Sequence, residues 1–323
     1  MGTRNYRIGV DIGGTKLAAG IVDREGNIVG ECVTYDHVNL PEEEVLNRIE
    51  RNINNALIEA GISLDEVSGI GVLFPGHIRW PDGIALTTSN LPGFKNYPLR
   101  EKMEARFGIP CLADNDANAQ ALAEYRYGAG TGLDPMVFLT VSTGIGGGII
   151  IGGRLYRGFA GTAGEFGHMI VDVSSGQRCT CGNYGCLMSL ASGIVIPRAA
   201  ERISKRLANE GACADLPNGC HDFDSLNGAI LAAGCADENA LCKAVVMEYA
   251  RYIGIGMYNV FQILNPKGIV LGGGLLNLPD FFFNEAMEIC YRLAGNMMYD
   301  RMIIKRGLLG IKAAVIGAAS LFE

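Results

Sequence analysis

Residues 6–35 alternate between apolar and polar side chains as short strands do, with glycine-rich turns at Gly13-Gly14 and at residues 24–27. This pattern predicts a meander of antiparallel strands. From Pro41 the apolar positions change to helical spacing, which continues to Gly61 and predicts a helix. Further along, the pattern predicts a buried strand over 70–74, a long loop over 75–98 and a helix over 117–127.

The second half of the chain repeats the beginning. The segment VFLTVSTGIGGGIIIGGRLYRG, from residue 137, follows the same strand, glycine turn and strand order as YRIGVDIGGTKLAAGIVDREGNIVG, from residue 6. Two such segments indicate an internal duplication and predict two related domains that face each other across a cleft. Helices are expected over 192–210 and 225–263, a strand over 269–271, and a last helix near Gly310 whose small apolar residues must pack closely against a partner.

Composition narrows the classes of protein. The chain has 323 residues, 49% of them hydrophobic, and its 45 glycines follow no three-residue period, so collagen and disorder are excluded. The net charge is −7 and there is no long basic run, which argues against a nucleic-acid partner. Because the sequence contains neither a membrane-spanning apolar run nor the pattern of a signal peptide, we expect a cytoplasmic protein without a membrane partner.

Two glycine turns are candidates for phosphate binding. Asp11-Ile12-Gly13-Gly14-Thr15-Lys16 joins the first two strands, and Thr143-Gly144-Ile145-Gly146-Gly147-Gly148 stands at the same place in the second half. Such turns let backbone N–H groups converge on phosphate oxygens, Thr15 and Thr143 add hydroxyl groups, and Asp11 suits a Mg²⁺ ion held through water. The alternative for a single turn is a plain hairpin, which the recurrence disfavours. Neither a Rossmann nor a P-loop glycine pattern occurs.

A polar cluster, Asp114-Asn115-Asp116, stands where a strand gives way to a helix. Asp and Asn are preferred N-caps, so one of the three is expected to cap the helix. A cap does not require three such residues. A carboxylate can also orient a hydroxyl group and accept its proton, which makes this cluster a candidate catalytic site.

His168, Cys179, Cys181 and Cys186 form a possible Cys₃His set for a structural zinc ion. A histidine alone is more often a satisfied core residue, but Gly182 and Gly185 would let the cysteine loop fold round an ion. Four protein ligands leave no open position for water, so this zinc would be structural rather than catalytic.

The sequence resembles the ROK family of sugar kinases and repressors, within the hexokinase and actin-like ATPase superfamily. The resemblance covers nearly the whole chain and rests on VDIGGTK (10–16), NLPGF (90–94), DNDAN (114–118), STGIGGGII (142–150), GEFGH (164–168), CTCGNYGCL (179–187) and VLGGG (270–274). It implies an α/β, two-domain actin-like ATPase (ribonuclease H-like) fold with an interdomain cleft. The domains would be residues 1–117 with a C-terminal helix at about 308–323, and residues 118–307 with the zinc loop.

The resemblance also implies functions for individual residues. Asp116 would be the catalytic base of an ATP-dependent hexose kinase, most like glucokinase, acting on the 6-hydroxyl group. The sugar ligands would be Gly76, His77, Asn90, Asn115, Glu165 and His168. The nucleotide would be bound by Asp11, Gly13, Gly14, Thr15, Lys16, Thr143, Gly144, Gly272 and Gly273. ATP, Mg²⁺ and a structural Zn²⁺ are the implied cofactors, and a homodimer is expected.

One position departs from the family pattern. Family members usually have Leu-Glu after the last zinc cysteine, and that glutamate binds sugar, whereas this chain has Leu187-Met188. Methionine cannot make the hydrogen bonds of a carboxylate, so the sequence allows altered sugar specificity, weak activity, or a sensor without catalysis; an inconsequential surface methionine is the fourth reading.

The other substrates left open are N-acetylglucosamine, N-acetylmannosamine and allose, and the proline or arginine common at position 77 is here His77. A ROK transcription regulator is the alternative of another class. We expect no helix-turn-helix, because the first predicted strand begins near Tyr6. A filament-forming actin relative is disfavoured by the zinc loop and the DNDAN segment.

Overall fold

The computed structural model describes residues 4–87, 91, 93–298 and 300–322. The chain divides into two compact units. Unit 1 contains residues 1–133, 148–164 and 307–323, and unit 2 contains residues 134–147 and 165–306. The domain limits expected from the sequence, 1–117 with about 308–323 and 118–307, place residues 118–133, 148–164 and 307 with the other part. These limits remain a prediction.

Unit 1 is built on a sheet in the order β3-β2-β1-β4-β7. The strands are β1 (Tyr6–Ile12), β2 (Leu17–Val22), β3 (Ile28–Thr34), β4 (Val67–Phe74) and β7 (Cys111–Asn115). β1, β2 and β3 are antiparallel neighbours, whereas β4 is parallel to both β1 and β7. The predicted meander is therefore confirmed, and it forms one side of a mixed sheet.

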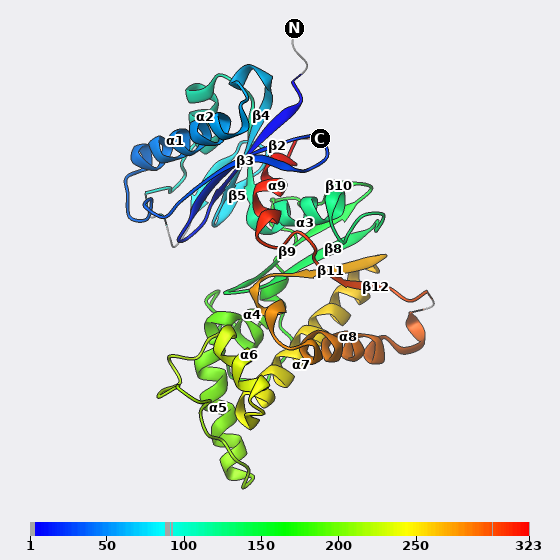
Figure 1. Cartoon of the computed structure of the whole chain (residues 1–323). Coiled ribbons are helices and arrows are strands. Elements are labelled where there is room, and N and C mark those ends of the chain that lie inside the picture. The colour runs from blue at the N-terminus through cyan, green and yellow to red at the C-terminus, as the bar shows by residue number, and fades with distance from the viewer. Residues whose placement is uncertain (1–3, 88–90, 92, 299, 323) are drawn as a thin grey trace. The chain divides into compact units, whose positions relative to one another are not determined.

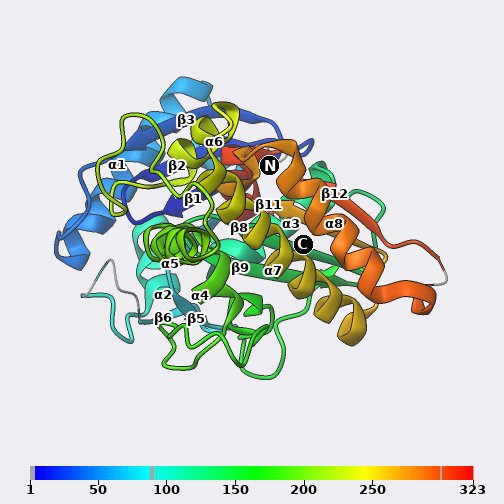
Figure 2. The same cartoon turned by 90° about the horizontal axis from the view of Figure 1, so that it is seen from below.

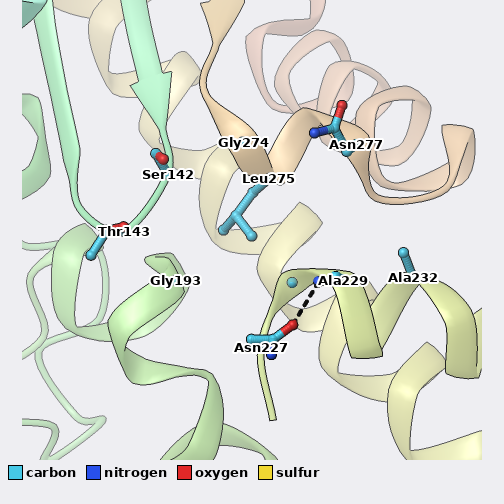
Figure 3. Close-up of a pocket in the computed structure, with 10 residues that line it drawn as sticks. Ser142, Thr143, Gly193, Asn227, Ala229, Ala232, Gly274, Leu275 and Asn277 are labelled. Atoms are coloured by element: carbon cyan, nitrogen blue, oxygen red, sulfur yellow. Dashed lines mark hydrogen bonds between the residues drawn. The ribbon is translucent and has the colours of Figure 1, made fainter. Parts of the chain in front are cut away.

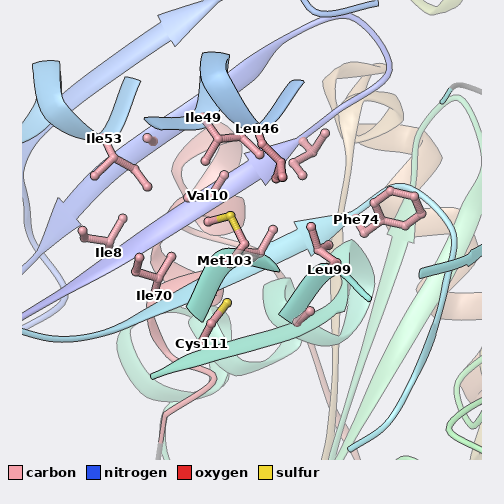
Figure 4. Close-up of a cluster of buried hydrophobic side chains, with 14 of the residues drawn as sticks. Ile8, Val10, Leu46, Ile49, Ile53, Ile70, Phe74, Leu99, Met103 and Cys111 are labelled. Carbon is pink, nitrogen blue, oxygen red and sulfur yellow. The ribbon is translucent and has the colours of Figure 1, made fainter. Parts of the chain in front are cut away.

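One face of this sheet is covered by α1 (Glu42–Ala60) and α2 (Leu99–Phe107). Figure 4 shows the apolar core between these helices and the sheet. α1 contributes Leu46, Ile49 and Ile53 to this core, and α2 contributes Leu99 and Met103. α1 begins after Pro41 and ends at Gly61, which has φ 66°, as expected from its sequence.

The other face is covered by α9 (Ala313–Ala319), which packs against β1, β2 and β4 and against α3 (Asp116–Tyr127). The close approach depends on glycine. A Cβ atom at Gly9 would stand 2.0 Å from the carbonyl oxygen of Val315, and one at Gly71 would stand 1.8 Å from that of Ala318. The tight packing expected of the last helix is thus confirmed. At both glycines the sheet lies against the backbone of α9 rather than against its side chains.

A buried carboxylate, that of Glu124, holds the segment with which the chain re-enters unit 1. Glu124 of α3 is 2% exposed and accepts hydrogen bonds from the backbone N–H groups of Ala129, Leu308 and Leu309, at 2.8, 3.1 and 2.9 Å. This carboxylate joins the end of α3 to the segment that leads into α9.

Unit 2 contains the parallel strands β8 (Met136–Val141), β11 (Gly268–Gly272) and β12 (Ile303–Arg306). β9 (Ile145–Ile151) begins in unit 2, and β10 (Arg154–Leu155) pairs with its end. The order of this sheet is β10-β9-β8-β11-β12, and it matches that of the first sheet: an antiparallel pair at one edge and three parallel strands at the other. The repeated topology agrees with the internal duplication inferred from the sequence.

The helices of unit 2 are α4 (Leu187–Ala191), α5 (Ile196–Asn209), α6 (Gly228–Ala236), α7 (Ala240–Leu264) and α8 (Asp280–Ala294). α7 and α8 lie side by side, as Figures 1 and 2 show. The helix expected over 225–263 is divided, because Glu238 has φ 60° and Asn239 starts α7 with an N-cap. None of the described helices is long and apolar enough to cross a membrane.

The segment 75–98 is more ordered than the predicted loop. It contains a short hairpin of β5 (His77–Arg79) and β6 (Ile84–Thr87) and then leads into α2, which the sequence analysis did not predict. The sequence pattern also did not predict α8 and β12. The remaining short turns of 3₁₀ helix lie at 64–66, 166–168, 193–195, 274–277, 295–297 and 310–312.

Candidate functional site

The first glycine turn connects β1 to β2 in unit 1. The N–H of Gly13 donates to the carbonyl oxygen of Lys16 at 2.9 Å, while Thr15 is exposed. Neither Gly13 nor Gly14 has a positive φ. The conformational freedom that hairpins demand of glycine therefore does not explain these two residues. At Gly13 a Cβ atom would stand 3.0 Å from the carbonyl oxygen of Lys16, so close packing favours glycine there, and phosphate binding at this turn stays a prediction.

Two side chains support this turn. Asp11 is 8% exposed, and its carboxylate lies 3.4 Å from Nζ of Lys16. Burial raises the pKa of Asp11, and the charge of Lys16 opposes that shift. His37 is fully buried, and its Nε2–H donates to the carbonyl oxygen of Gly13 at 2.8 Å, which fixes the turn from below.

The second glycine turn connects β8 to β9 and lies at the corresponding place in the second sheet. The N–H of Ser142 donates to the carbonyl oxygen of Gly144 at 2.8 Å, and Ile194 N–H donates to that of Thr143 at 3.0 Å. Thr143 is exposed, and Gly144 has no positive φ. The two turns thus occupy the same place, between the first two strands of their sheets. In both turns the named glycines have no positive φ that would require glycine.

A pocket of about 340 Å³ opens beside the second turn, entirely within unit 2. Figure 3 shows Ser142 and Thr143 on one side, Gly274 and Leu275 on another, and the start of α6 below. Its lining residues are Ser142, Thr143, Gly193, Asn227, Gly228, Ala229, Ala232, Gly274, Leu275 and Asn277. This volume falls within the range of about 300–1,000 Å³ typical of small-molecule sites.

The third glycine segment contributes to this pocket through Gly274. Gly273 has φ 95°, and a Cβ there would stand 2.4 Å from the carbonyl oxygen of Val141, so this position admits only glycine without strain. Gly272 faces inward, against the ring of Phe138. The structure therefore places Gly274 in the pocket wall, whereas the sequence-based selection of Gly272 and Gly273 stays a prediction.

The polar cluster before α3 separates into three environments. Asp114 is 5% exposed and forms an ion pair with Arg157, with Oδ2 and Nε 2.8 Å apart. Asn115 caps the helix, because its side-chain oxygen accepts from the N–H of Asn118 at 2.8 Å. Asp116 is exposed, and one of its oxygens accepts from the N–H of Ala117. Of the two carboxylates, only that of Asp116 is exposed at the helix start.

Arg157 was not found by sequence reasoning. Its guanidinium group lies over the ring of Trp80, 3.7 Å from the ring centre, while it pairs with Asp114. The ion pair connects the loop after β10 with the start of α3, both in unit 1. No local motif marks Arg157, because its partners are distant in the sequence.

The remaining sugar-ligand predictions fall on both units. Gly76 donates its N–H to the carbonyl oxygen of Phe74, and His77 is exposed at the start of β5. Asn90 lies outside the described residues. Glu165 and His168 begin and end a turn of 3₁₀ helix in unit 2, and Glu165 Oε2 is 4.0 Å from His168 Nε2.

The four predicted zinc ligands come together. Their ligand atoms all lie within 4.8 Å of one another. The Sγ atoms of Cys181 and Cys186 are 3.7 Å apart, and Cys179 Sγ is 3.6 Å from His168 Nδ1. Tetrahedral zinc with its usual bond lengths requires about 3.8 Å between two sulfurs and about 3.6 Å between sulfur and nitrogen. The donor set therefore fits a structural zinc ion.

The loop that brings these ligands together depends on two glycines with positive φ. Gly182 has φ 94°, and its N–H donates to the carbonyl oxygen of Cys179 at 3.0 Å. Gly185 has φ 73°, and a Cβ atom there would overlap the carbonyl oxygen of Asp172.

The thiols of this loop differ in pKa. Burial raises the pKa of the Cys186 thiol to about 12, whereas a hydrogen bond from the backbone of Asn183 lowers the pKa of Cys181.

Met188, the residue that departs from the family pattern, contacts the second glycine turn. The N–H of Ile145 donates to its Sδ at 3.3 Å. Its methyl group lies 3.3 and 3.2 Å from where Cβ atoms would stand on Gly144 and Gly167. Met188 thus joins the turn at 143–144 to the segment that carries Glu165 and His168, which argues against an inconsequential surface methionine.

Comparison with known proteins agrees with this architecture. A ROK hexokinase from Thermus thermophilus superposes with a TM-score of 0.81 at 31% identity, over 98% of this chain and 97% of that one. A ROK family glucokinase from Streptomyces griseus, solved with glucose and AMPPNP, gives 0.77 at 32% identity, over 98% of both chains. A glucokinase of Streptomyces coelicolor is 35% identical over 318 residues, 97% of this chain and 96% of that protein.

The duplicated sheets and their paired turns define an α/β protein of the actin-like ATPase fold, as the sequence predicted. The chain belongs to the ROK family, whose model matches residues 7–323. Repressors are also among its relatives: a putative xylose repressor of Caldicellulosiruptor is 29% identical over 97% of this chain and 77% of that protein.

Proposed function

We propose that the protein is a sugar kinase that transfers the γ-phosphoryl group of ATP to a hexose, with glucose phosphorylated at its 6-hydroxyl group. Glucokinases and a ROK hexokinase similar over nearly their whole length support the class of reaction. The observation that carries the catalytic assignment is the division of work at the start of α3: Asp114 is buried in an ion pair and Asn115 caps the helix, so Asp116 is the exposed carboxylate.

In this reaction Asp116 orients the hydroxyl group and accepts its proton as the sugar oxygen attacks phosphorus. Asn115 uses its side-chain oxygen in the cap, so its amide nitrogen is the atom it offers to a sugar hydroxyl. Glu165 and His168 add hydrogen bonds to further hydroxyl groups, with His168 using Nε2 because Nδ1 faces the cysteine sulfurs.

The nucleotide is held by the turns Gly13-Gly14-Thr15 and Thr143-Gly144, and its adenosine part occupies the pocket of about 340 Å³ in unit 2. Lys16 contributes positive charge near the phosphates, and Asp11 is the carboxylate suited to a hydrated Mg²⁺ ion. Mg²⁺ bound with ATP neutralises charge that develops on the phosphoryl oxygens. Of the third glycine segment, Gly272 and Gly273 shape the backbone that presents Gly274.

The zinc ion held by His168, Cys179, Cys181 and Cys186 would have a structural task. It fixes the tautomer and orientation of His168, so that Nε2 is presented to the sugar. We further expect a homodimer in the cytoplasm, where ATP is available; light scattering of the purified protein tests the first expectation.

The catalytic assignment is tested by Asp116→Asn, which keeps the side-chain shape and removes the base. We expect kcat with glucose to fall by about 10²–10⁴-fold, while the KM for ATP changes little. ADP release across a panel of hexoses is the measurement, and Asp65→Asn, at an exposed aspartate of the same unit, is the control. If the Asp116→Asn variant keeps its hexose-dependent turnover, Asp116 is not the catalytic base. If the wild-type protein shows no turnover with any sugar, the protein is not a sugar kinase.

The sugar itself is tested at Met188. N-acetylglucosamine, N-acetylmannosamine and allose are the competing substrates, and a carboxylate at this position would offer a charged hydrogen bond to one hydroxyl group. We expect Met188→Glu to change the ratio of kcat/KM between glucose and these sugars by about tenfold or more. Met188→Leu keeps the apolar volume and should leave the ratio unchanged. If both variants have the wild-type ratio, Met188 does not set specificity.

A sugar-responsive regulator of transcription is the second candidate, favoured by the resemblance to the xylose repressors. A gel-shift experiment with DNA upstream of the protein's own gene, with and without each hexose, distinguishes it from the kinase. Sugar-dependent, sequence-specific binding together with absent turnover would support the regulator.

A further inference from the structure

A second pocket of about 420 Å³ lies in unit 1 and is rich in arginine. Its walls include Arg4, Arg7 and Arg24, and also Asp23, Tyr127 and Ser320. We call it the arginine pocket. Its volume lies within the range of small-molecule sites, about 300–1,000 Å³.

Arginines outnumber carboxylates in the lining of this pocket, which contains Arg4, Arg7 and Arg24 but one aspartate, Asp23. None of the described carboxylates forms an ion pair with Arg4, Arg7, Arg24 or the neighbouring Arg126. The one acidic side chain in the lining, Asp23, is occupied in its own turn.

That turn uses both oxygens of Asp23. Oδ1 accepts from the N–H groups of Glu25 and Asn27 at 3.0 and 2.8 Å, and Oδ2 accepts from the amide of Asn27 at 3.0 Å. Burial lowers the pKa of Arg7, and the nearby charges of Arg126 and Arg24 lower it further. Like charges are thus held close together, which creates a positive potential that an anion relieves.

The walls of the pocket are fixed by contacts of their own. Arg7 donates to the carbonyl oxygen of Phe322 at 2.6 Å, and Arg126 donates to that of Ser320 at 2.7 Å. Tyr127 donates to the carbonyl oxygen of Arg24, and its ring fills the space beside Gly26. Arg7 and Arg126 are therefore held in position before a ligand binds, which reduces the cost of ordering these two side chains.

The arginine pocket is separate from the turn proposed to bind ATP. Arg7 stands near the start of β1, and Gly13 follows its end. Six residues of extended strand separate them by about 20 Å. A ligand in the arginine pocket is therefore not the phosphate group bound at Gly13 and Gly14.

We propose that the arginine pocket binds a small phosphate ester. Guanidinium groups present paired N–H donors that match phosphate oxygens, and several of them around one cavity form a typical phosphate site. The volume leaves room for an organic group beside the phosphate. The inference does not depend on the proposed kinase reaction.

Isothermal titration with glycerol 3-phosphate tests the proposal, with inorganic phosphate and glycerol as the comparison ligands. We expect saturable binding of glycerol 3-phosphate that weakens with added salt, and none of glycerol. Equal binding of inorganic phosphate would support a site for the phosphate group alone, whereas tighter binding of the ester would support a site for the whole molecule.

Variants test whether glycerol 3-phosphate binds in the arginine pocket. Arg24→Gln and Arg4→Gln remove exposed arginines and should each weaken binding about tenfold, with Arg24→Lys between Arg24→Gln and wild type. Lys102→Gln, at an exposed cation on α2 of the same unit, should bind as wild type does. Thermal melting checks that each variant is folded. The proposal is overturned if glycerol 3-phosphate does not bind, or if both arginine variants bind it with unchanged affinity.

Discussion

Asp114 and Arg157 show how much a single contact matters at the residue scale. The two side chains are only 6% and 14% exposed, so each would be costly to leave without the other. Asp114 also accepts from the N–H of Asn115 and from the amide of Asn118, at 2.8 and 2.9 Å. The ion pair therefore supports the backbone and the cap from which Asp116 projects.

Arg157→Ala should reduce the free energy of unfolding by about 3–5 kcal/mol, because it leaves a buried carboxylate without its partner. Urea denaturation followed by circular dichroism measures the loss. Arg79→Ala is the matched control: Arg79 pairs with Asp82 on the same unit, but both side chains are 53% exposed, so the change should cost less than about 1 kcal/mol. Equal losses in the two variants would show that the Asp114 pair contributes nothing beyond a surface contact.

At the scale of elements, the segment that carries the predicted zinc ligands has little regular structure of its own. Residues 176–188 include the first two residues of α4 and take part in the isolated β-bridges Ile170–Cys186 and Arg178–Tyr184. Four metal–ligand bonds would supply what the backbone does not.

Removal of zinc by a strong chelator should therefore lower the melting temperature and increase amide hydrogen exchange in residues 168–188, with little change in α1 of unit 1. Elemental analysis of the untreated protein should find about one zinc per chain. Cys181→Ser removes one thiolate from an exposed position and should have the same effect without chelator, whereas Cys213→Ser, also exposed, should have none. Full exchange protection in the chelated protein would contradict a structural role for zinc.

The elements that sequence reasoning predicted were those with a strong local signal. α1 has helical spacing, a proline at its start and a glycine at its end, and the meander has glycine turns. The hairpin of β5 and β6 was missed, because its short strands lie within a segment of Pro, Gly and Asn that is typical of loops. α8 does have apolar positions at helical spacing, among them Phe282, Ala286 and Ile289, so this helix was open to prediction.

The residues of the candidate site also divide into those with a local sequence signal and those without one. The zinc ligands and the cluster at 114–116 are close in the sequence, so their spacing revealed them. Arg157, His37 and the wall of the pocket at Asn227 were missed, because each contacts residues that only the tertiary structure brings near. Glycine was the hardest residue to interpret from the sequence. Gly147 was predicted to lie in the second turn, but it lies in β9, where a Cβ atom would strike the ring of Phe166 and the carbonyl oxygen of Phe138.

At the scale of the whole molecule, the chain order and the compact units do not coincide. Unit 1 takes its sheet from residues 1–133 but one of its covering helices, α9, from residues 313–319. The interface with α9 is built from glycines that leave no side chain on that part of the sheet, so the backbone of α9 lies directly against Gly9 and Gly71. The last segment is thus part of the core of the first domain.

A fragment of residues 1–133 should therefore fail to fold, although it contains all five strands of the first sheet. Val315, Ile316 and Leu321 are at most 4% exposed. Their burial contributes about 5–9 kcal/mol at about 1.5–3 kcal/mol per side chain, which is comparable to the whole stability of a domain, about 5–15 kcal/mol. Joining residues 307–323 to residue 133 through a flexible glycine-serine linker should make unfolding more cooperative than in residues 1–133 alone, because α9 can then reach its place on β1 and β4. Both fragments lack residues 148–164, and so Arg157, which means that comparing them isolates the contribution of α9. Urea titrations followed by near-ultraviolet circular dichroism compare the two fragments. Cooperative unfolding of residues 1–133 alone would show that the sheet and α1 are a sufficient core, and that α9 is an addition to a domain already stable without it.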